Sequence, residues 1–333
     1  MSTISAAAAY PINAGGFNSP GGQVAYGGTA YSGTFIPVLW SGKLAQKFYA
    51  ATVFGEIANT DWQGDISGMG DTVVINTIPT ITISNYSVGQ NLSYEVPAPS
   101  TIQLVINKGK YFGVNVNNVL ELQTKPKLMD MFTNDASMQM KIKIDQDVLL
   151  GTFNQGSAGN QGAAAGQISG GYNLGTDTAP VTLTAANILQ NITALSSVLD
   201  EANVPETDRW LIITPTERQL LMQSNAAQAQ FMGDASSMLR NGKIGMIDRF
   251  TVYVSNLTPR AAANTTWTGS GNTSAKRHAI MAGHMSAITF ASQIAKVESL
   301  QNPNDFGTLV RGLNVYGYHV TQPNALALLV AAN

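Results

Sequence analysis

Histidine is the side chain that most readily supports both acid–base catalysis and metal binding near neutral pH. The chain has three, His278, His284 and His319. The first two are six residues apart in an apolar segment, so an extended strand would place them on one face. None of the three has the His-Glu-x-x-His spacing of a helical zinc site. A metal pair at His278 and His284 is conceivable, but histidines buried in a core or an interface explain the pattern better.

Two groups of carboxylates are the other candidates for binding a cation or exchanging a proton. Asp61, Asp65 and Asp71 lie among glycines, but they lack the Asp-x-Asp-x-Asp-Gly loop and distal glutamate of a calcium site. Asp145 and Asp147 are two residues apart in an expected helix, so their side chains diverge. We expect these two to be solvated or paired across a subunit boundary.

The usual signatures of enzymes are missing from the sequence. It contains no cysteine and no Gly-x-Ser-x-Gly motif, which excludes disulfides, thiolate metal sites and a serine nucleophile of that type. The glycine-rich residues 151–178 lack the Gly-Lys-Ser/Thr ending of a phosphate-binding loop. We therefore expect no catalytic residue, no cofactor and no metal, and hence a protein that is not an enzyme.

Composition favours a protein that is covered by copies of itself. Charged residues make up only 11% of the 333 residues, against about 25% in a typical soluble domain. A surface so poor in charge invites association. The net charge of −2 and the absence of a basic run argue against specific nucleic-acid binding. No apolar run approaches the roughly 20 residues of a spanning helix, so we expect no membrane contact.

The first 42 residues carry no charge and are punctuated by glycine and proline. They do not form a secretory signal, because they lack a basic start and an apolar core. We expect a flexible arm here, followed by an amphipathic helix over residues 37–51. Trp40, Leu44 and Phe48 are four residues apart and share one face of that helix, which core packing explains better than a ligand site.

A projecting hairpin is the next expected element. Residues 72–83 are rich in β-branched side chains and residues 101–106 form the natural return strand, with a long polar tip between them. Pro79 suits an edge strand rather than a central one. Because a lone hairpin is marginally stable in water, this one should lie on another subunit.

A long helix is expected over residues 126–150, with Thr124 as its cap and Pro126 in its first turn. Apolar residues form two stripes, so both sides of the helix should be covered. One stripe consists of Leu128, Met131, Phe132, Met138, Ile142 and Leu149, and the other of Met129, Ala136, Met140 and Ile144.

Further helices and strands alternate without strict β-α-β order, which predicts a mixed α+β fold. A helix is expected over 184–203, and a capping box at Thr214–Glu217 predicts another helix start. Strands are expected over 210–213, 250–254, 279–290, 297–300 and 309–320.

The order of these segments resembles that of the major capsid proteins of tailed bacteriophages, whose shell fold is named after phage Hong Kong 97. No single motif carries the resemblance, which depends on the order of several over some 300 residues. The segments are Phe35-Ile36-Pro37 to Phe48, Gly70-Asp71-Thr72-Val73, Arg209 to Pro215, His278 to His284, Gly312 to Gly317, and Pro323 to Ala327.

The resemblance implies a division of the chain into the parts of that fold. These are an N-terminal arm (1–58), an extended loop (59–110), a peripheral domain with a long spine helix (111–177 and 278–317) and an axial domain (178–277 and 318–333). The candidates for contacts between subunits are Trp40, Phe48, Val73, Ile75, Tyr86, Tyr94, Ile102, Leu104, Met140 and Ile144.

The resemblance also implies a function. It is that of a major capsid protein whose hexamers and pentamers form an icosahedral shell around double-stranded DNA, in a virion assembled in the host cytoplasm with a portal. An encapsulin-like shell around cargo, or a surface-binding module without a shell, is the alternative. The uncharged start cannot form the charged helical scaffold that some family members carry, so a separate scaffolding protein is expected. Lys108 and Lys110 lie at the base of the hairpin, and no residue pattern supports carrying over the family's lysine–asparagine cross-link.

Overall fold

In the computed structural model, residues 47–333 form one compact unit. Helices and strands are mixed along its sequence, as predicted. The described residues are 49–62, 72–79, 81–117, 128–224, 245–261, 266–268, 277–303 and 306–332.

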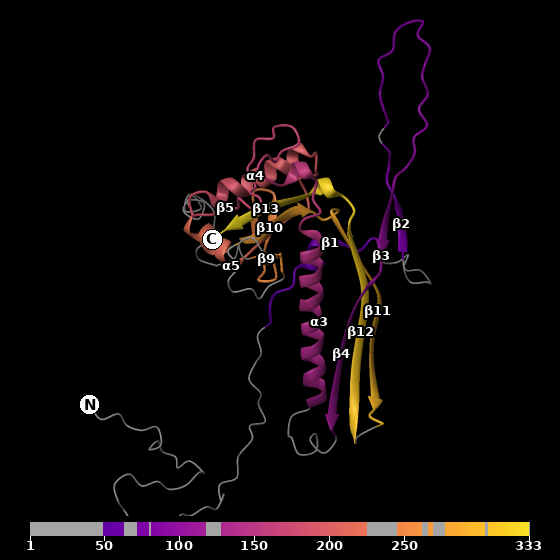
Figure 1. The fold of residues 1–333 in the computed structure, drawn as a ribbon, viewed down its shortest axis with the longest axis vertical. Coiled ribbons are helices and arrows are strands. Elements are labelled where there is room, and N and C mark those ends of the chain that lie inside the picture. The colour runs from indigo at the N-terminus through magenta and orange to yellow at the C-terminus, as the bar shows by residue number, and fades with distance from the viewer. Residues whose placement is uncertain are drawn as a thin grey trace, which may run out of the picture. The chain divides into compact units, whose positions relative to one another are not determined.

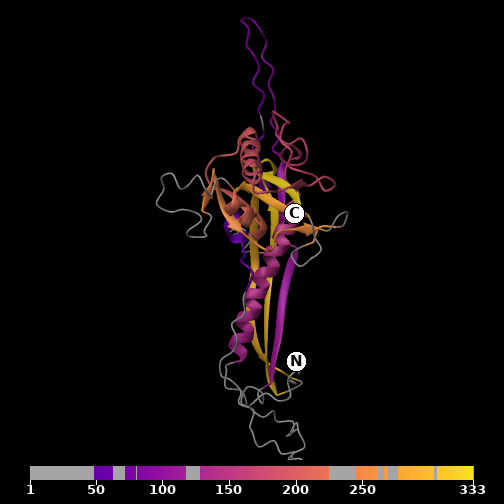
Figure 2. The same ribbon diagram turned by 90° about the vertical axis from the view of Figure 1, so that its left-hand side faces the viewer.

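A sheet of long strands supports the spine helix. Its strand order is β1 (Ala58–Asn59), β11 (Ile288–Gln301), β12 (Gly307–Val320) and β4 (Lys108–Asn117), and the long pairs are antiparallel. Helix α3 (Leu128–Thr152) packs along β4 and β12, and both views show it beside them (Figures 1 and 2). The two strands expected over 279–290 and 297–300 are wrong in their bounds, because residues 277–284 form one strand and 288–301 form β11, which has one register shift.

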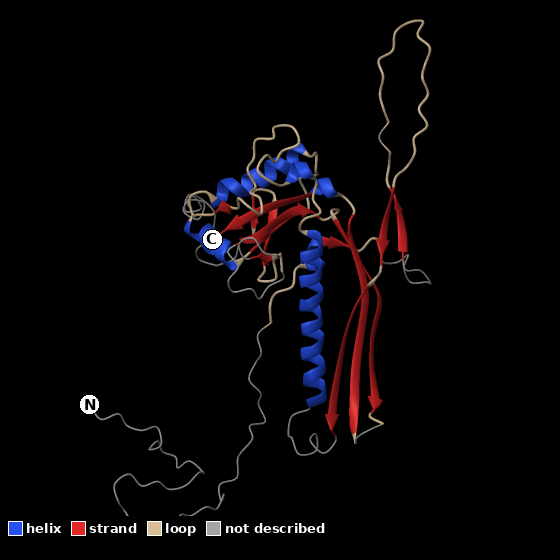
Figure 3. Cartoon of the chain, in the orientation of Figure 1, coloured by secondary structure: helices blue, strands red, loops and turns tan. Residues whose placement is uncertain are grey.

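A second sheet forms the centre of the other part of the unit. Helix α4 (Ile188–Glu201) packs on its strand β13 and touches α5 (Pro215–Gln223) (Figure 3). Among the described residues its order is β5 (Val181–Thr182), β13 (Leu326–Ala332), β10 (Arg277–His284), β6 (Arg209–Ile213), β8 (Phe250–Val254) and β7 (Met246–Ile247), with β9 (Arg260–Ala261) also paired to β10.

The second sheet corrects the predicted division of the chain. Strand β10 pairs with β6 and β13, so the segment beginning at residue 278 belongs to this sheet and not with the spine helix. Strand β12 continues to Val320 in the first sheet, beyond the predicted boundary at 317. Strands β6 and β13 are buried along their whole described length apart from Ala332. Strands that are buried on both faces of a sheet have continuous apolar sequences, without the alternation of apolar and polar residues seen in half-exposed strands.

The main apolar core lies around the second sheet and reaches the last third of α3. There Ile144, Val148 and Leu149 are buried. The first half of α3 is different, because Met131, Phe132 and Met138 are exposed. The expected helix is thus confirmed, but it is covered mainly toward its C-terminal end. Its predicted cap, Thr124 and Pro126, lies outside the described residues.

The hairpin is shorter at its paired base than the sequence predicts. Strand β2 (Thr72–Asn76) pairs antiparallel with β3 (Thr101–Val105), and the expected continuation to residue 83 does not pair. A last bond from Thr77 N to Ser100 O closes the ladder, two residues before Pro79. Beyond it the loop 77–100 extends past the strand ends (Figure 1). Proline cannot donate to a ladder, which accounts for the early end.

Candidate assembly surfaces

The described carboxylates and histidines do not assemble into a metal or catalytic cluster. No three His, Asp or Glu side chains among them lie close enough to share a metal ion. No helix in the same residues is long and apolar enough to cross a membrane. Asp65 and Asp71 lie outside the described residues, and Asp61 is exposed.

Two of the histidines have local structural partners. His278 is buried on β10, and its Nε2 lies 2.5 Å from Oε1 of the fully buried Glu217. Glu217 caps α5, where it accepts from the backbone N–H and the hydroxyl of Thr214. Burial acts to raise the pKa of Glu217, but His278 and Thr214 outweigh it and lower that pKa. His284 pairs with Ser286, whose Oγ lies 2.8 Å from its Nδ1.

Asp145 is not solvated, so that prediction is wrong. Its side chain is fully buried and accepts the backbone N–H groups of Val53 (3.2 Å) and Phe54 (3.0 Å). Burial raises the pKa of Asp145 to about 6 against the lowering effect of these two bonds. The carboxyl therefore fastens the chain preceding β1 to the spine helix. Spacing along α3 alone does not reveal this, because the partner lies 92 residues away.

Asp147 is also paired inside the subunit rather than across a boundary. It accepts from Lys108 Nζ (3.1 Å) and the Tyr316 hydroxyl (2.9 Å). Tyr318 donates to the backbone oxygen of Asp147, and its ring lies under the Lys108 ammonium at 4.2 Å. Burial lowers the pKa of Lys108, but Tyr318 and Asp147 outweigh it and raise that pKa. This group joins β4, α3 and β12 below the hairpin.

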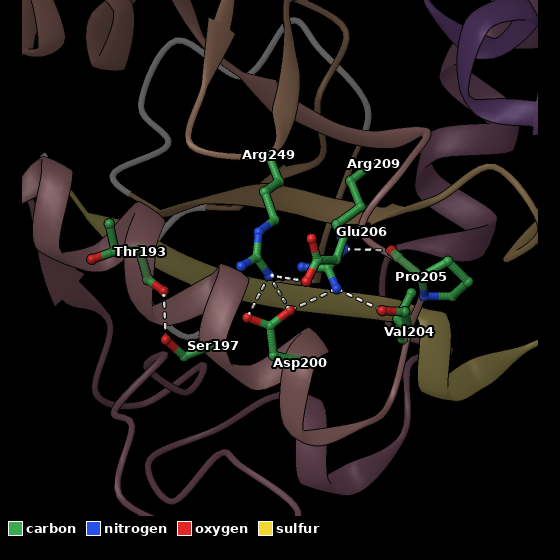
Figure 4. A network of polar contacts seen from close by, with 8 residues as sticks. All are labelled: Thr193, Ser197, Asp200, Val204, Pro205, Glu206, Arg209 and Arg249. Atoms are coloured by element: carbon green, nitrogen blue, oxygen red, sulfur yellow. Dashed lines mark hydrogen bonds and ion pairs between the residues drawn. The ribbon is translucent and has the colours of Figure 1, made fainter.

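A second polar group fixes the turn between α4 and β6 (Figure 4). Asp200 pairs with the buried Arg209 (2.7 Å) and with Arg249 (2.9 Å). Arg209 also donates to the backbone oxygens of Val204 (2.6 Å) and Pro205 (2.7 Å). A guanidinium holding two carbonyls and a carboxylate is a structural clamp, and the sequence contains no local signal for it.

The loop 77–100 presents apolar side chains that the subunit leaves uncovered. Val88 is 97% exposed, Tyr94 85% and Tyr86 67%. Glu95 is the one charged residue of this loop, and its carboxylate accepts the backbone N–H of Thr82. Exposed apolar patches of this kind mark sites of protein contact. The structure thus leaves Tyr86 and Tyr94 available for the predicted contact between subunits. Other exposed apolar residues of this loop are Ile78, Ile81, Ile83, Leu92 and Val96.

The base of the hairpin has its own small core. It includes Leu104, which the sequence predicts as a contact between subunits. Leu104 is fully buried with Ile106 and Ala291, and Val73 and Ile75 pack against them. Leu104 therefore contacts its own subunit, because β3 lies on β12 and beside β11. Ile102 is half-buried opposite Ile75 in the ladder.

The candidates from the helices divide in a similar way. Ile144 lies in the main core, so its assignment to a contact between subunits is wrong. Met140 is half-buried and packs against that core. Trp40 and Phe48 lie outside the described residues. Packing against elements distant in sequence decides these outcomes, and periodicity within α3 does not.

One further surface was missed by the sequence reasoning. Tyr111, Leu313 and Lys296 are neighbours across β4, β12 and β11 and line a hollow of about 380 Å³ on the first sheet. Beside them Arg311 donates to Glu298 at 2.9 and 2.6 Å. The pKa of Glu298 is lowered by Lys296 and Arg311. The alternation of apolar and polar residues at Val114-Asn115-Val116-Asn117 is the sequence signal that could have predicted a two-faced strand here.

Comparisons with known proteins agree with this architecture. A family model described as phage capsid protein matches residues 99–329. A structure from Mycobacterium phage Che8 is 25% identical, with a TM-score of 0.69 over 88% of this chain and 96% of that one. The capsid structure of Cyanophage P-SCSP1u is 19% identical, with a TM-score of 0.69 over 95% and 99%. The mature capsid of bacteriophage PhiM1 is 14% identical, with a TM-score of 0.64 over 89% and 91%.

No curated protein sequence matches significantly. The structural likeness confirms the predicted α+β fold of the Hong Kong 97 type. The family model covers more than half of the chain and includes α3, the return strand of the hairpin and all of both sheets except β1 and the end of β13. The chain therefore belongs to the phage capsid protein family.

Proposed function

We propose that this chain is the major capsid protein of a tailed phage and that its copies close an icosahedral shell from rings of six and five. Family membership makes it a shell-forming component of the virion. The proposal adds the ring sizes, enclosure of double-stranded DNA, and assembly in the host cytoplasm on a portal. Closed point-group assemblies cover exposed strand edges and apolar loops, which this subunit presents.

The observation that carries the proposal is the uncovered loop 77–100. Its apolar side chains include the almost fully exposed Val88 and the exposed Tyr86 and Tyr94. Such residues gain free energy at roughly 25 cal/mol per Å² of apolar surface when another surface covers them. A neighbouring subunit supplies that surface in a ring. Nothing in the described residues favours an encapsulin-like shell or a module that acts without a shell.

The proposal assigns no catalytic role to the chain. Buried carboxylates and histidines serve local structure in the described residues, as Asp145 and Glu217 do. It assigns no specific nucleic-acid contact either, because the net charge is −2. DNA would be confined by the wall rather than bound to it. Curvature would come from a separate scaffolding protein, since residues 1–42 carry no charge.

The loop can be tested by replacing its tip. Residues 84–100 would be exchanged for a Gly/Ser linker of equal length, and the chain would be co-expressed with the scaffolding protein of its phage. We expect a folded subunit by far-UV circular dichroism and a loss of shells in electron micrographs. A matched variant, Met246→Ser, removes an exposed apolar side chain elsewhere and should assemble normally. Normal shells from the linker variant would contradict the proposed role of the loop.

The scaffold part of the proposal has its own test. The unmodified chain expressed alone should give aberrant or mixed particles. Uniform shells of one size from this chain alone would overturn that part and leave the shell function intact.

A further inference from the structure

We propose that the outer edge of strand β4 pairs with the same edge of a second copy of this chain, antiparallel and with Gly113 opposite its own copy. The contact would continue the first sheet from one subunit into the next around a twofold axis. It is a contact surface additional to the loop 77–100, and it does not depend on the role proposed for that loop.

Strand β4 forms one margin of the first sheet, and Figure 2 shows it there beside α3. It pairs with β12 along all ten of its residues. On its other side, no strand of the described part of the subunit follows it. The outer row of its backbone N–H and C=O groups therefore has no strand partner in that part. Such an edge is a template for pairing with another chain.

The usual protections of an exposed edge are missing from most of β4. Natural edge strands are short, or carry prolines, bulges or charges. At the margins of the second sheet, β5 and β7 have only two residues each. In the first sheet, β11 has a register shift after Ser292 and carries Lys296 and Glu298. Strand β4, in contrast, has ten residues in an unbroken register, and residues 111–117 contain neither a charge nor a proline.

A second copy of β4 is a partner whose sequence fits this edge. A twofold axis normal to the sheet places two β4 strands side by side and antiparallel, with one residue opposite its own copy. It also keeps the faces that carry α3 on the same side. With Gly113 at the axis, the half-buried Phe112 lies opposite Val114 of the second copy, and the exposed Tyr111 lies opposite Asn115. Apolar side chains then meet on the covered face.

The lysines at the start of β4 restrict the register. Like charges directly opposite each other destabilise a strand pair, so an axis at Lys110 is unfavourable. An axis at Gly113 sets Lys110 opposite Val116 of the second copy. It also leaves Lys108 outside the paired segment, where it keeps its bond to Asp147. The charges of the two copies are thus kept apart.

The position of Gly113 also suits the overlap of the two strands. An axis there pairs residues 109–117 of each copy, which is all of β4 except its first residue. An axis at Phe112 would pair as many residues, but it would set Lys108 against the apolar Val116. A Cβ atom at Gly113 meets nothing within 4 Å in the subunit, so a side chain can be added there without disturbing the fold.

Because the chain has no cysteine, a single substitution tests both the contact and its register. Gly113→Cys in the full-length chain would set two thiols opposite each other, at a Cα separation that a disulfide accepts. Gly109→Cys is the matched control on the same exposed face of β4. In the proposed register its own copy lies about 27 Å away, at 3.4 Å per residue. Both variants would be oxidised as concentrated unassembled chain and as particles made with the scaffolding protein.

We expect Gly113→Cys to give a band of dimer mass on non-reducing gels in at least one of the two samples, with a peptide linked through position 113. Gly109→Cys should stay at monomer mass. Monomer mass for Gly113→Cys in both samples would overturn the inference, as would equal yields of dimer from the two variants. Shells that form without this link would refute the β4 contact and leave the shell function intact.

Charge variants at the same position supply a measurement that needs no cross-link. Gly113→Lys and Gly113→Glu each set like charges about 5 Å apart across the axis. Each variant alone should lower the yield of dimer, or of shells where the contact forms only there, by roughly tenfold. An equal mixture of the two sets opposite charges together and should restore the yield. The control Gly109→Lys adds its charge away from the axis and should change the yield by no more than about twofold.

Two outcomes of this second experiment would contradict the proposed pairing. One is a yield from Gly113→Lys and Gly113→Glu that equals that of the wild type. The other is a mixture that recovers no better than either variant alone, because the loss would then come from the added side chain and not from its charge.

Discussion

Replacing Asp145 by asparagine should remove a pH dependence that is built into the spine helix. Burial raises the pKa of this carboxyl from 3.8 to about 6 in the folded chain. The folded state therefore holds the proton to a higher pH than the unfolded state does. Stability from this group is fully present below the unfolded pKa and is lost as pH rises through the folded pKa, between about 4 and 6. At 1.36 kcal/mol per unit, the loss is about 3 kcal/mol.

An asparagine side chain cannot ionise, so the Asp145→Asn variant should lose this part of the slope. Its amide oxygen can still accept the N–H of Val53 or Phe54, which are 3.2 and 3.0 Å from the native carboxylate. Its NH2 group brings two buried donors, and leaving them unpaired costs about 1–3 kcal/mol. At pH 7.5 the two effects oppose each other, so the difference in slope is the decisive quantity.

The assay is urea unfolding of the unassembled full-length subunit between pH 4.5 and 7.5. The wild type should lose stability relative to Asp145→Asn by about 2 kcal/mol over that interval, because about a third of the full loss lies below pH 4.5. Asp130→Asn removes an exposed carboxyl from the same helix and should follow the wild type. Parallel curves for the wild type and Asp145→Asn would refute the reasoning, because they would show that Asp145 has the same pKa in both states.

Glycine and leucine positions at the hairpin base give further predictions. A Cβ at Gly317 would clash with the Val105 backbone oxygen, so Gly317→Ala should separate β12 from β3 and lower the melting temperature strongly. Gly113→Ala in the same sheet meets nothing within 4 Å, and its stability measured by the same melt should change by no more than about 0.5 kcal/mol. Leu104→Ala empties a fully buried site beside Ala291 and should cost about 2–5 kcal/mol in urea unfolding. A urea unfolding curve unchanged by Leu104→Ala would mean that the hairpin base has no core of its own.

Local signals in the sequence predicted several elements correctly. The capping box at Thr214 and Glu217 begins α5, as expected, because both of its bonds form within four residues. The existence of α3 follows from its apolar spacing. Strand β13 (Leu326–Ala332) was missed, since a buried strand has no alternation to distinguish it from a buried helical segment.

The candidate surfaces were predictable only where no distant element intervenes. Tyr86 and Tyr94 belong to a loop that its own subunit leaves exposed, so reading them as exposed from the local sequence was sufficient. Leu104 belongs to the same predicted hairpin and its local sequence gives no sign of burial. In the structure, however, Ala291 of β11 packs against it. Asp145 looked like a surface carboxylate because its partners, Val53 and Phe54, come from another part of the chain. Tertiary packing decides whether such residues are buried, and the periodicity of a helix or strand carries no information about that packing.

Electron cryo-microscopy of the full-length chain, co-expressed with the scaffolding protein of its phage, tests the central claim most directly. The account predicts closed shells of rings of six and five, in which residues 77–100 of each subunit lie on an adjacent subunit. Tyr86 and Tyr94 should then be covered by that neighbour. Subunits that remain monomeric, or shells in which this loop touches no neighbour, would contradict it.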